Sequence, residues 1–298
     1  MNNQIALVFP GQGSQQIGMS KSLFEKFPQI QTYFNMAQDI LGFDIQQIMF
    51  NGSEDDLKST KVTQPALFIH SLLAFFMHPE LEFQAVAGHS LGEISALVAA
   101  KVFDFETGLK LVKTRAFSMQ DACENEPGTM AVVLGMSENQ INELCQKISQ
   151  DYQEILVPAN YNCPEQIVIS GSTNAIEISL DIFKKAGAKR ILKINVGGAF
   201  HSPLMKCAFN KVKAHIDSIE FLKPIVPIYQ NVNALPQSNP ISIKENLIQQ
   251  IISPVLWTQT IQNMTSDGFS NFIEIGSGKV LQGLIKKINS NVQTNHIL

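Results

Sequence analysis

The chain has 298 residues, of which 45% are hydrophobic and 16% are charged, and its 22 Lys and Arg against 26 Asp and Glu leave a net charge of −4. At roughly 150 residues per domain, this length predicts about two structural units with enough apolar side chains to bury a core. The mild acidity provides no chain-wide basic surface, which argues against a protein devoted to nucleic acid.

The first third of the chain has the pattern of an α/β layer. Apolar residues 4–9 end in Pro10-Gly11, which is typical of a buried parallel strand followed by a tight turn. The uncharged stretch 62–79 contains prolines and histidines, so it predicts a buried helix and not a membrane span. Residues 82–88 predict a second strand, and residues 91–101 carry apolar side chains at helical spacing. Strand, glycine turn and helix in this order indicate a sheet covered by helices.

The middle of the chain has a different order of elements. The predicted strands are 129–136, 155–159, 166–170 and 189–196, and the predicted helices are 137–150 and 175–186. The order βαββαβ matches the split-βαβ, ferredoxin-like unit. We therefore expect a small domain at residues 128–196.

The last third returns to the first pattern. Residues 227–229 and 271–275 predict further strands, so the beginning and the end of the chain are expected to share one sheet. The fold class that follows is α/β, with a larger domain of residues 1–127 and 197–298 into which the small domain is inserted.

The segment Gly88-His89-Ser90-Leu91-Gly92 fits the pattern G-x-S-x-G and falls between a predicted strand and a predicted helix. Small residues two positions before and after the serine allow the sharp turn that exposes its hydroxyl, and the helix N-terminus points N–H groups at a developing charge. We interpret Ser90 as a nucleophile at such a turn. The alternative is a plain helix cap.

A serine needs a base to be nucleophilic at neutral pH. Of the six histidines, His201 lies in the loop after the predicted strand 189–196, following residues 197–200, where α/β enzymes place catalytic groups. His70 falls in the buried stretch, and His89 is expected to point away from Ser90 across the turn. No Asp or Glu stands out as a third member, so a backbone carbonyl is an alternative partner that would orient His201.

The turn Gly11-Gln12-Gly13 ends the first predicted strand and leaves several possibilities. A Walker A motif fails because Met19 stands where its lysine must be, and a dinucleotide fingerprint fails because Gln16 replaces the third glycine. What stays open is a backbone N–H donor beside the serine, or a tight turn with no role in chemistry.

Arginine is scarce in this chain, since only Arg115 and Arg190 occur. Arg115 lies in an apolar helical pattern after the proposed serine turn, where its planar fork would suit a substrate carboxylate. A surface salt bridge is the alternative. No HExxH, EF-hand or Cys/His cluster is present, so we expect no metal site, and four scattered cysteines indicate free thiols in a reducing, cytoplasmic compartment.

Together these motifs resemble those of the malonyl-CoA:acyl-carrier-protein transacylases, bacterial enzymes of fatty acid synthesis whose acyltransferase family is shared with polyketide synthases. The resemblance covers essentially the whole chain. The segments that carry it are Phe9-Pro-Gly-Gln-Gly-Ser-Gln15, Thr63-Gln-Pro-Ala66, Gly88-His-Ser-Leu-Gly-Glu93, Arg115 followed by Met119-Gln120, Gln166-Ile-Val-Ile-Ser-Gly171, Ala199-Phe-His-Ser202 and Pro254-Val-Leu-Trp257. It implies a hydrolase-like parallel-sheet core domain with a ferredoxin-like insertion, in agreement with the order of elements above.

The resemblance also implies roles for individual residues. Ser90 would be acylated, His201 would be its base, and the backbone carbonyl of Gln250 would orient that histidine. The backbone N–H groups of Gln12 and Leu91 would form the oxyanion hole. The residues implied for substrate binding are Arg115, which would pair with the free carboxylate of malonate, together with Gln64, Phe200, Asn160, Asn162 and Gln166.

The implied reaction moves a malonyl group from malonyl-CoA to acyl carrier protein through a malonyl-serine intermediate. We expect no cofactor, no nucleic-acid or membrane partner, and a monomer. A trans-acting acyltransferase of a polyketide synthase would share these residues. A hydrolase on the same scaffold is less favoured because such hydrolases usually lack the arginine, and a non-catalytic carrier-docking module is disfavoured because nucleophile, base and arginine are all present.

Overall fold

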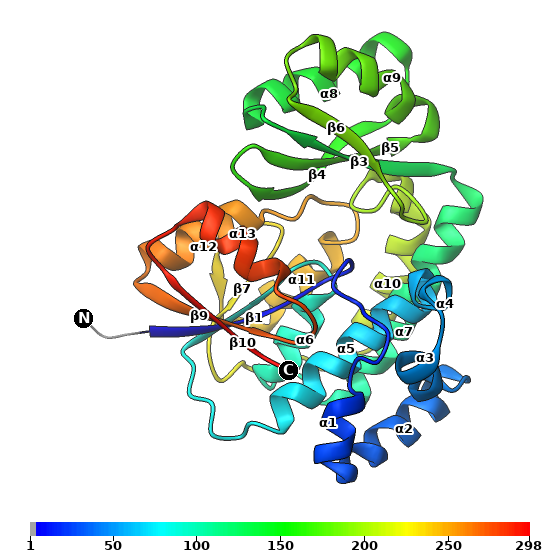
Figure 1. Ribbon diagram of the computed structural model, residues 1–298. Helices are drawn as coiled ribbons and strands as arrows, with labels where there is room; N and C mark the ends of the chain where they lie inside the picture. Colours follow the sequence, from blue (N-terminus) through cyan, green and yellow to red (C-terminus); the bar gives the residue numbers. More distant parts are fainter. Residues whose placement is uncertain (1–3) are drawn as a thin grey trace.

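The computed structural model describes residues 4–298, and two separate sheets organise it (Figure 1). The larger sheet has six strands in the order β10-β9-β1-β2-β7-β8. Its strands are β1 (Gln4–Phe9), β2 (Ala85–Gly88), β7 (Ile228–Tyr229), β8 (Pro236–Gln237), β9 (Phe269–Ile275) and β10 (Gln293–Ile297). All neighbours pair in parallel except β8, which lies antiparallel to β7 at one edge. The prediction that both ends of the chain share one sheet is confirmed.

Side-chain alternation along β1 buries both faces of this sheet. Leu7 and Phe9 belong to one apolar cluster, whereas Ala6 and Val8 belong to another on the opposite face. Successive residues of a strand point to opposite faces, so a run of apolar residues without polar alternation requires helices on both sides. Burial on both faces explains why β1 reads as a continuous apolar run.

Helices of different lengths cover the two faces. The buried helix predicted for the uncharged stretch 62–79 is α5, which is buried along most of its length and contains Pro65. The helices of the larger unit are α1 (Lys21–Lys26), α2 (Gln31–Leu41), α3 (Ile45–Asn51), α4 (Glu54–Lys58), α5 (Thr60–Phe76), α6 (Gly92–Ala99), α7 (Phe105–Asn125), α10 (Lys206–Asp217), α11 (Pro240–Gln249), α12 (Trp257–Ser266) and α13 (Val280–Ile288), with short 3-10 turns at Pro28–Ile30 and Pro203–Met205. Within residues 4–298 no helix has the length and apolarity needed to span a membrane.

The smaller sheet has four antiparallel strands in the order β4-β5-β3-β6. It is built from β3 (Gly128–Leu134), α8 (Glu138–Tyr152), β4 (Leu156–Cys163), β5 (Gln166–Ser172), α9 (Thr173–Lys185) and β6 (Arg190–Ile194). The predicted order βαββαβ and the predicted fold class are confirmed. A capping box starts α8, because Ser137 and Gln140 bond reciprocally there.

The two faces of the small sheet have different neighbours. Ala131 and Val133 of β3 pack with the helices α8 and α9 in a separate apolar cluster. Met130 of β3 and Val168 of β5 point the other way and join the core of the larger unit. In Figure 1 the small sheet therefore lies above the large unit, with its two helices on the far side. All strands of the small sheet fall within the proposed insertion 128–196.

The register of the central strands determines where a site can form. Phe9 at the end of β1 pairs with Gly88 at the end of β2. The loops that follow these two residues therefore leave the same edge of the sheet side by side, and the N–H of His89 donates to the carbonyl of Phe9 at 2.9 Å. The carboxyl ends of adjacent parallel strands are where open α/β sheets bind ligands.

Candidate active site

Ser90 occupies a strained turn between β2 and α6. Its backbone is left-handed, with φ 52°, a conformation that is uncommon for residues other than glycine. The glycines around it are required by contact: a Cβ at Gly88 would overlap the backbone of Gly92, and a Cβ at Gly92 would overlap the carbonyl of Phe9. The pattern G-x-S-x-G therefore has a steric cause here, and the side chain of Ser90 does not cap α6, whose N-cap residue is Leu91 and has no side-chain hydrogen bond.

His201 lies against Ser90 in the folded protein. Its Nε2 is 2.8 Å from the Ser90 Oγ, and its Nδ1 is 2.9 Å from the carbonyl oxygen of Gln250 and 3.1 Å from that of Ser253. Because carbonyl oxygens only accept hydrogen bonds, Nδ1 carries the proton and Nε2 is the acceptor for the serine hydroxyl. Two main-chain carbonyls thus stand where an acidic residue would stand in a triad.

Burial keeps this imidazole neutral. His201 is 3% exposed, and burial together with the charge of Arg115 lowers its pKa to about 3. A histidine with that pKa is unprotonated at neutral pH, which is the form that can accept the proton of a serine.

Because His201 is neutral, we can predict how kcat/KM depends on pH. With malonyl-N-acetylcysteamine, a thioester that lacks phosphate, kcat/KM should stay constant within about twofold from pH 7.5 to 5.5, because this ratio reports ionisation of the free enzyme. An ordinary histidine of pKa near 6.5 would lose roughly tenfold by pH 5.5, and such a loss would contradict the assignment. Burial raises the pKa of Glu93 to about 7, so this carboxylate also changes its charge between pH 7.5 and 5.5. The pH profile of Glu93→Gln, which lacks that carboxylate, serves as the control.

Arg115 approaches the same hydroxyl from α7. It is 2% exposed and donates to Gln64 Oε1 at 2.6 Å, to Ser90 Oγ at 3.0 Å and to Gln250 Oε1 at 3.2 Å. Burial lowers its pKa to about 10, so the guanidinium is still charged at neutral pH. Within residues 4–298 it forms no ion pair, and its Nε has no hydrogen-bond partner. The alternative of a surface salt bridge is therefore wrong.

A buried guanidinium without a carboxylate partner is costly unless a ligand supplies one. Its hydrogen bonds go to neutral oxygens, two of them on the side chains of Gln64 and Gln250. These amides hold the planar group beside Ser90 without neutralising it, and the buried Glu93 acts on its charge without forming an ion pair with it. The arrangement can bind an acyl group that ends in a carboxylate.

The backbone donors expected for an oxyanion hole lie at the same cavity. Gln12 and Leu91 both line it. In the part of the chain that the structure describes, neither N–H has a hydrogen-bond acceptor. Free N–H groups on the loops after β1 and β2 are what a tetrahedral oxyanion requires, so their role, still a prediction, has geometric support.

Asn231 is a site residue that sequence reasoning missed. Its Oδ1 accepts from the N–H of Ser90 at 2.7 Å, and its Nδ2 donates to the carbonyl of Gly88 at 2.6 Å. Its own N–H donates to the buried carboxylate of Glu93 at 2.8 Å. One side chain thus clamps the strained turn on both sides of His89. A polar pair directly after the strand β7, which adjoins β2, is the signal that could have revealed it.

Gln250 does more than the resemblance implies. Besides its carbonyl at His201, its side-chain Oε1 accepts from Arg115, and its Nε2 donates to the carbonyl of Ser90 at 2.9 Å. A single residue therefore touches the base, the guanidinium and the nucleophile's backbone. Its side chain is not evident from sequence because it lies 160 positions from Ser90.

The candidate catalytic groups line a cavity of about 250 Å³ between the two sheets. Of the residues predicted to bind substrate, Gln64, Arg115, Phe200, Asn160 and Asn162 line it. The apolar part of its wall comes from Leu91, Met119, Met130, Val168, Ile194, Val196 and Phe200.

Two predicted neighbours of the cavity have other contacts. Gln166 is not part of the cavity wall: its Oε1 accepts from Lys287 Nζ at 3.1 Å and lies 3.6 Å from Cys163 Sγ. Its role in binding stays a prediction. His89 faces away from Ser90 as expected, since its Nε2 lies 2.9 Å from Asn162 Oδ1.

Comparison with known proteins places this site in a family. The model of the acyl transferase domain matches residues 6–297. A protein of Staphylococcus aureus (strain COL) named malonyl CoA-acyl carrier protein transacylase is 40% identical over 295 residues, which cover 99% of this chain and 96% of the relative. A Bacillus subtilis protein of the same name is 39% identical and covers 98% of this chain and 92% of its own length.

Solved structures agree with the sequence relatives. The acyl carrier protein S-malonyltransferase of Vibrio cholerae superposes with a TM-score of 0.93 at 37% identity, covering 98% of this chain and 96% of that one. A malonyl-transacylase solved in complex with its type II PKS acyl-carrier protein gives a TM-score of 0.93 at 38% identity, covering 98% and 95%. The site geometry, the domain match and these likenesses over nearly the full length lead to one conclusion: this chain belongs to the acyl transferase family.

Proposed function

We propose that this protein transfers the malonyl group of malonyl-CoA to the phosphopantetheine thiol of an acyl carrier protein and so supplies fatty acid synthesis. The observation that carries the proposal is a buried, charged Arg115 without a carboxylate partner, 3.0 Å from the hydroxyl of Ser90. An acyl group with a free carboxylate satisfies this guanidinium, whereas acetyl does not. The names of the relatives in Staphylococcus aureus and Bacillus subtilis point to the same reaction.

In the first half-reaction, Ser90 attacks the thioester carbonyl of malonyl-CoA while His201 Nε2 takes the hydroxyl proton. The negative charge that forms on the carbonyl oxygen is stabilised by the N–H groups of Gln12 and Leu91, and one such donor is typically worth about 2.7–4 kcal/mol. The C–S bond then breaks, and the proton on His201 passes to the leaving thiolate. Coenzyme A leaves, and malonyl stays bound to Ser90 as an ester.

In the second half-reaction, the carrier's thiol enters the vacated site and gives its proton to His201 as its sulfur attacks the ester carbonyl. The Ser90–acyl bond breaks, and the proton returns from His201 to the serine oxygen. The two substrates thus use one site in turn, which predicts ping-pong kinetics. No step of this scheme draws on a metal or a cofactor, so the proposal includes neither.

A second candidate is malonyl transfer for a polyketide synthase. It is favoured by the likeness to a malonyl-transacylase whose structure includes a type II PKS acyl-carrier protein. The residues around Ser90 do not distinguish the two pathways, because the transferred group is the same and only the carrier differs. We infer a cytoplasmic enzyme that acts as a monomer, in keeping with free cysteines at positions 123, 145, 163 and 207.

The proposal is tested with purified protein, malonyl-CoA, acetyl-CoA and the holo forms of a fatty-acid and a polyketide carrier protein. We expect malonyl-carrier to form, with parallel lines in double-reciprocal plots and little free malonate. Preference for the fatty-acid carrier supports the first pathway, and preference for the other supports the second. Release of malonate as the main product would establish a hydrolase and overturn the proposal.

A further inference from the structure

Two side chains with a permanent charge line the active-site cavity within residues 4–298, and they lie at different depths. Arg115 is 2% exposed. Lys58, at the end of α4, has a side chain that is 48% exposed. One cation is therefore buried beside Ser90, and the other is at the opening of the cavity. Nothing in the mechanism above uses Lys58.

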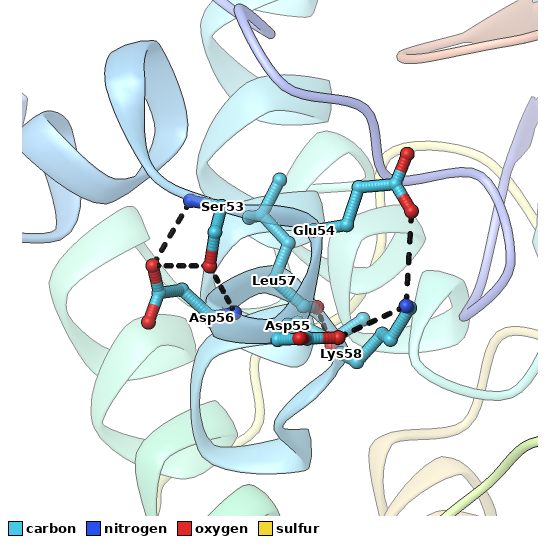
Figure 2. A network of polar contacts seen from close by, with 7 residues as sticks. Ser53, Glu54, Asp55, Asp56, Leu57 and Lys58 are labelled. Atoms are coloured by element: carbon cyan, nitrogen blue, oxygen red, sulfur yellow. Dashed lines mark hydrogen bonds and ion pairs between the residues drawn. The ribbon is translucent and has the colours of Figure 1, made fainter.

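The backbone around Lys58 is held firmly. Helix α4 begins with a capping box in which the N–H of Asp56 donates to Ser53 Oγ at 3.1 Å and the N–H of Ser53 donates to Asp56 Oδ2 at 2.9 Å (Figure 2). A second hollow of about 350 Å³ shares Gln15 and Lys58 with the cavity and is otherwise lined by Gln16, Ile17, Glu54 and Leu57. Lys58 thus lies where the two hollows meet.

In the free protein, Lys58 forms only weak ion pairs. Its Nζ is 3.1 Å from Asp55 Oδ1 and 3.7 Å from Glu54 Oε2, as Figure 2 shows. The side chains of these acids are 92% and 80% exposed, so solvent screens both pairs. The hydrogen bond to Asp55 raises the pKa of Lys58, which keeps the ammonium charged at neutral pH. Because such exposed, screened pairs contribute little, a phosphate held in place by the rest of a bound substrate can replace the two carboxylates.

We propose that Lys58 binds a phosphate of the phosphopantetheine arm that coenzyme A and the carrier protein share. This inference rests on the proposed function. When malonyl is attached to Ser90, its carboxylate lies at the buried end of the cavity. When malonyl is attached to the arm's sulfur instead, the carboxylate lies at that same end and the phosphate at the outer end. A buried guanidinium and an exposed ammonium match these two anions in position, and lysine is a common point-charge ligand for phosphate.

The test compares two thioesters that differ in phosphate. For Lys58→Gln, we expect KM for malonyl-CoA to rise about three- to tenfold, as for the loss of an exposed charge pair with a phosphate. KM for malonyl-pantetheine should change less than about twofold, because this substrate has no phosphate that Lys58 could bind. Asp55→Asn removes the competing carboxylate and should lower KM for malonyl-CoA, and Lys58→Arg should restore it.

Lys110→Gln is the matched control, because Lys110 is 51% exposed and paired with Glu106 but does not line the cavity. This substitution should change KM for neither thioester. A higher KM for both malonyl-CoA and the holo carrier supports a phosphate of the shared arm, whereas a higher KM for only one of them would contradict a shared phosphate. Equal losses with malonyl-pantetheine, or no change with any substrate, would overturn the role of Lys58. A wild-type protein that transfers no malonyl would instead contradict the proposed function.

Discussion

Ser90→Ala should abolish formation of the acyl-enzyme and lower the rate of malonyl transfer by at least about 10⁴-fold, as expected when the nucleophile of a covalent mechanism is removed. The physical reason is that, in the part of the chain that the structure describes, the Ser90 Oγ is the hydroxyl beside His201 Nε2, at 2.8 Å, and it also accepts from Arg115 Nη2 at 3.0 Å. The measurement is mass spectrometry of the intact protein after mixing with malonyl-CoA, followed by peptide mapping.

Ser95→Ala is the matched control, because Ser95 is a buried serine of helix α6, which begins just after the Ser90 turn. It should be labelled as fast as the wild type. Peptide mapping also separates an ester at Ser90 from an adventitious thioester at Cys207, the exposed cysteine. Rapid labelling of the Ser90→Ala protein at a third residue would mean that another nucleophile carries the reaction.

Arg115→Ala should lower kcat/KM for malonyl-CoA by roughly 10²- to 10⁴-fold, which corresponds to the 3–5 kcal/mol typical of breaking a buried ion pair. The substrate's carboxylate would then lie beside Ser90 without the buried cation, because the other permanently charged side chain on the cavity wall, within residues 4–298, is the exposed Lys58. Acetyl transfer should fall far less, because acetyl has no charge to compensate. The measurement is the ratio of kcat/KM for malonyl-CoA to that for acetyl-CoA in each variant.

The ratio matters more than the malonyl rate alone. Arg115 also donates to the Ser90 hydroxyl and to the side chain of Gln250, so its loss disturbs the site for every substrate. Arg115→Lys keeps the charge but loses the planar fork, and its ratio should lie between those of the wild type and Arg115→Ala. An equal loss for both acyl groups would remove Arg115 from the recognition of the carboxylate.

Elements with a strong local pattern were predicted well from sequence. The apolar run of β1 and the glycines around Ser90 carry their structural cause in the residues themselves: burial on both faces for the strand, and close backbone approach for the turn. Strand β4 was predicted at 155–159 but spans Leu156–Cys163. Its polar second half, with Asn160 and Asn162, has low strand propensity, and pairing with β5 and with Val255 outweighs it.

Strand β10 was missed for a similar reason. Its residues Gln293–Ile297 are mostly polar, and only the hydrogen bonds to β9 make them a strand. An edge strand with few apolar side chains has no periodicity to recognise.

The sequence by itself determined the class of fold and indicated the candidate nucleophile and the candidate base, because these depend on local spacing and on loops that follow strands. Only the tertiary structure decided that Arg115 is buried without an ion pair, that two carbonyls orient His201, and that Asn231 clamps the turn at Ser90. These contacts join residues far apart in the chain, such as Ser90 and Asn231 at a separation of 141 positions. The packing of the helices and loops over the sheet determines which residues make these contacts, and a local sequence pattern carries no information about that packing.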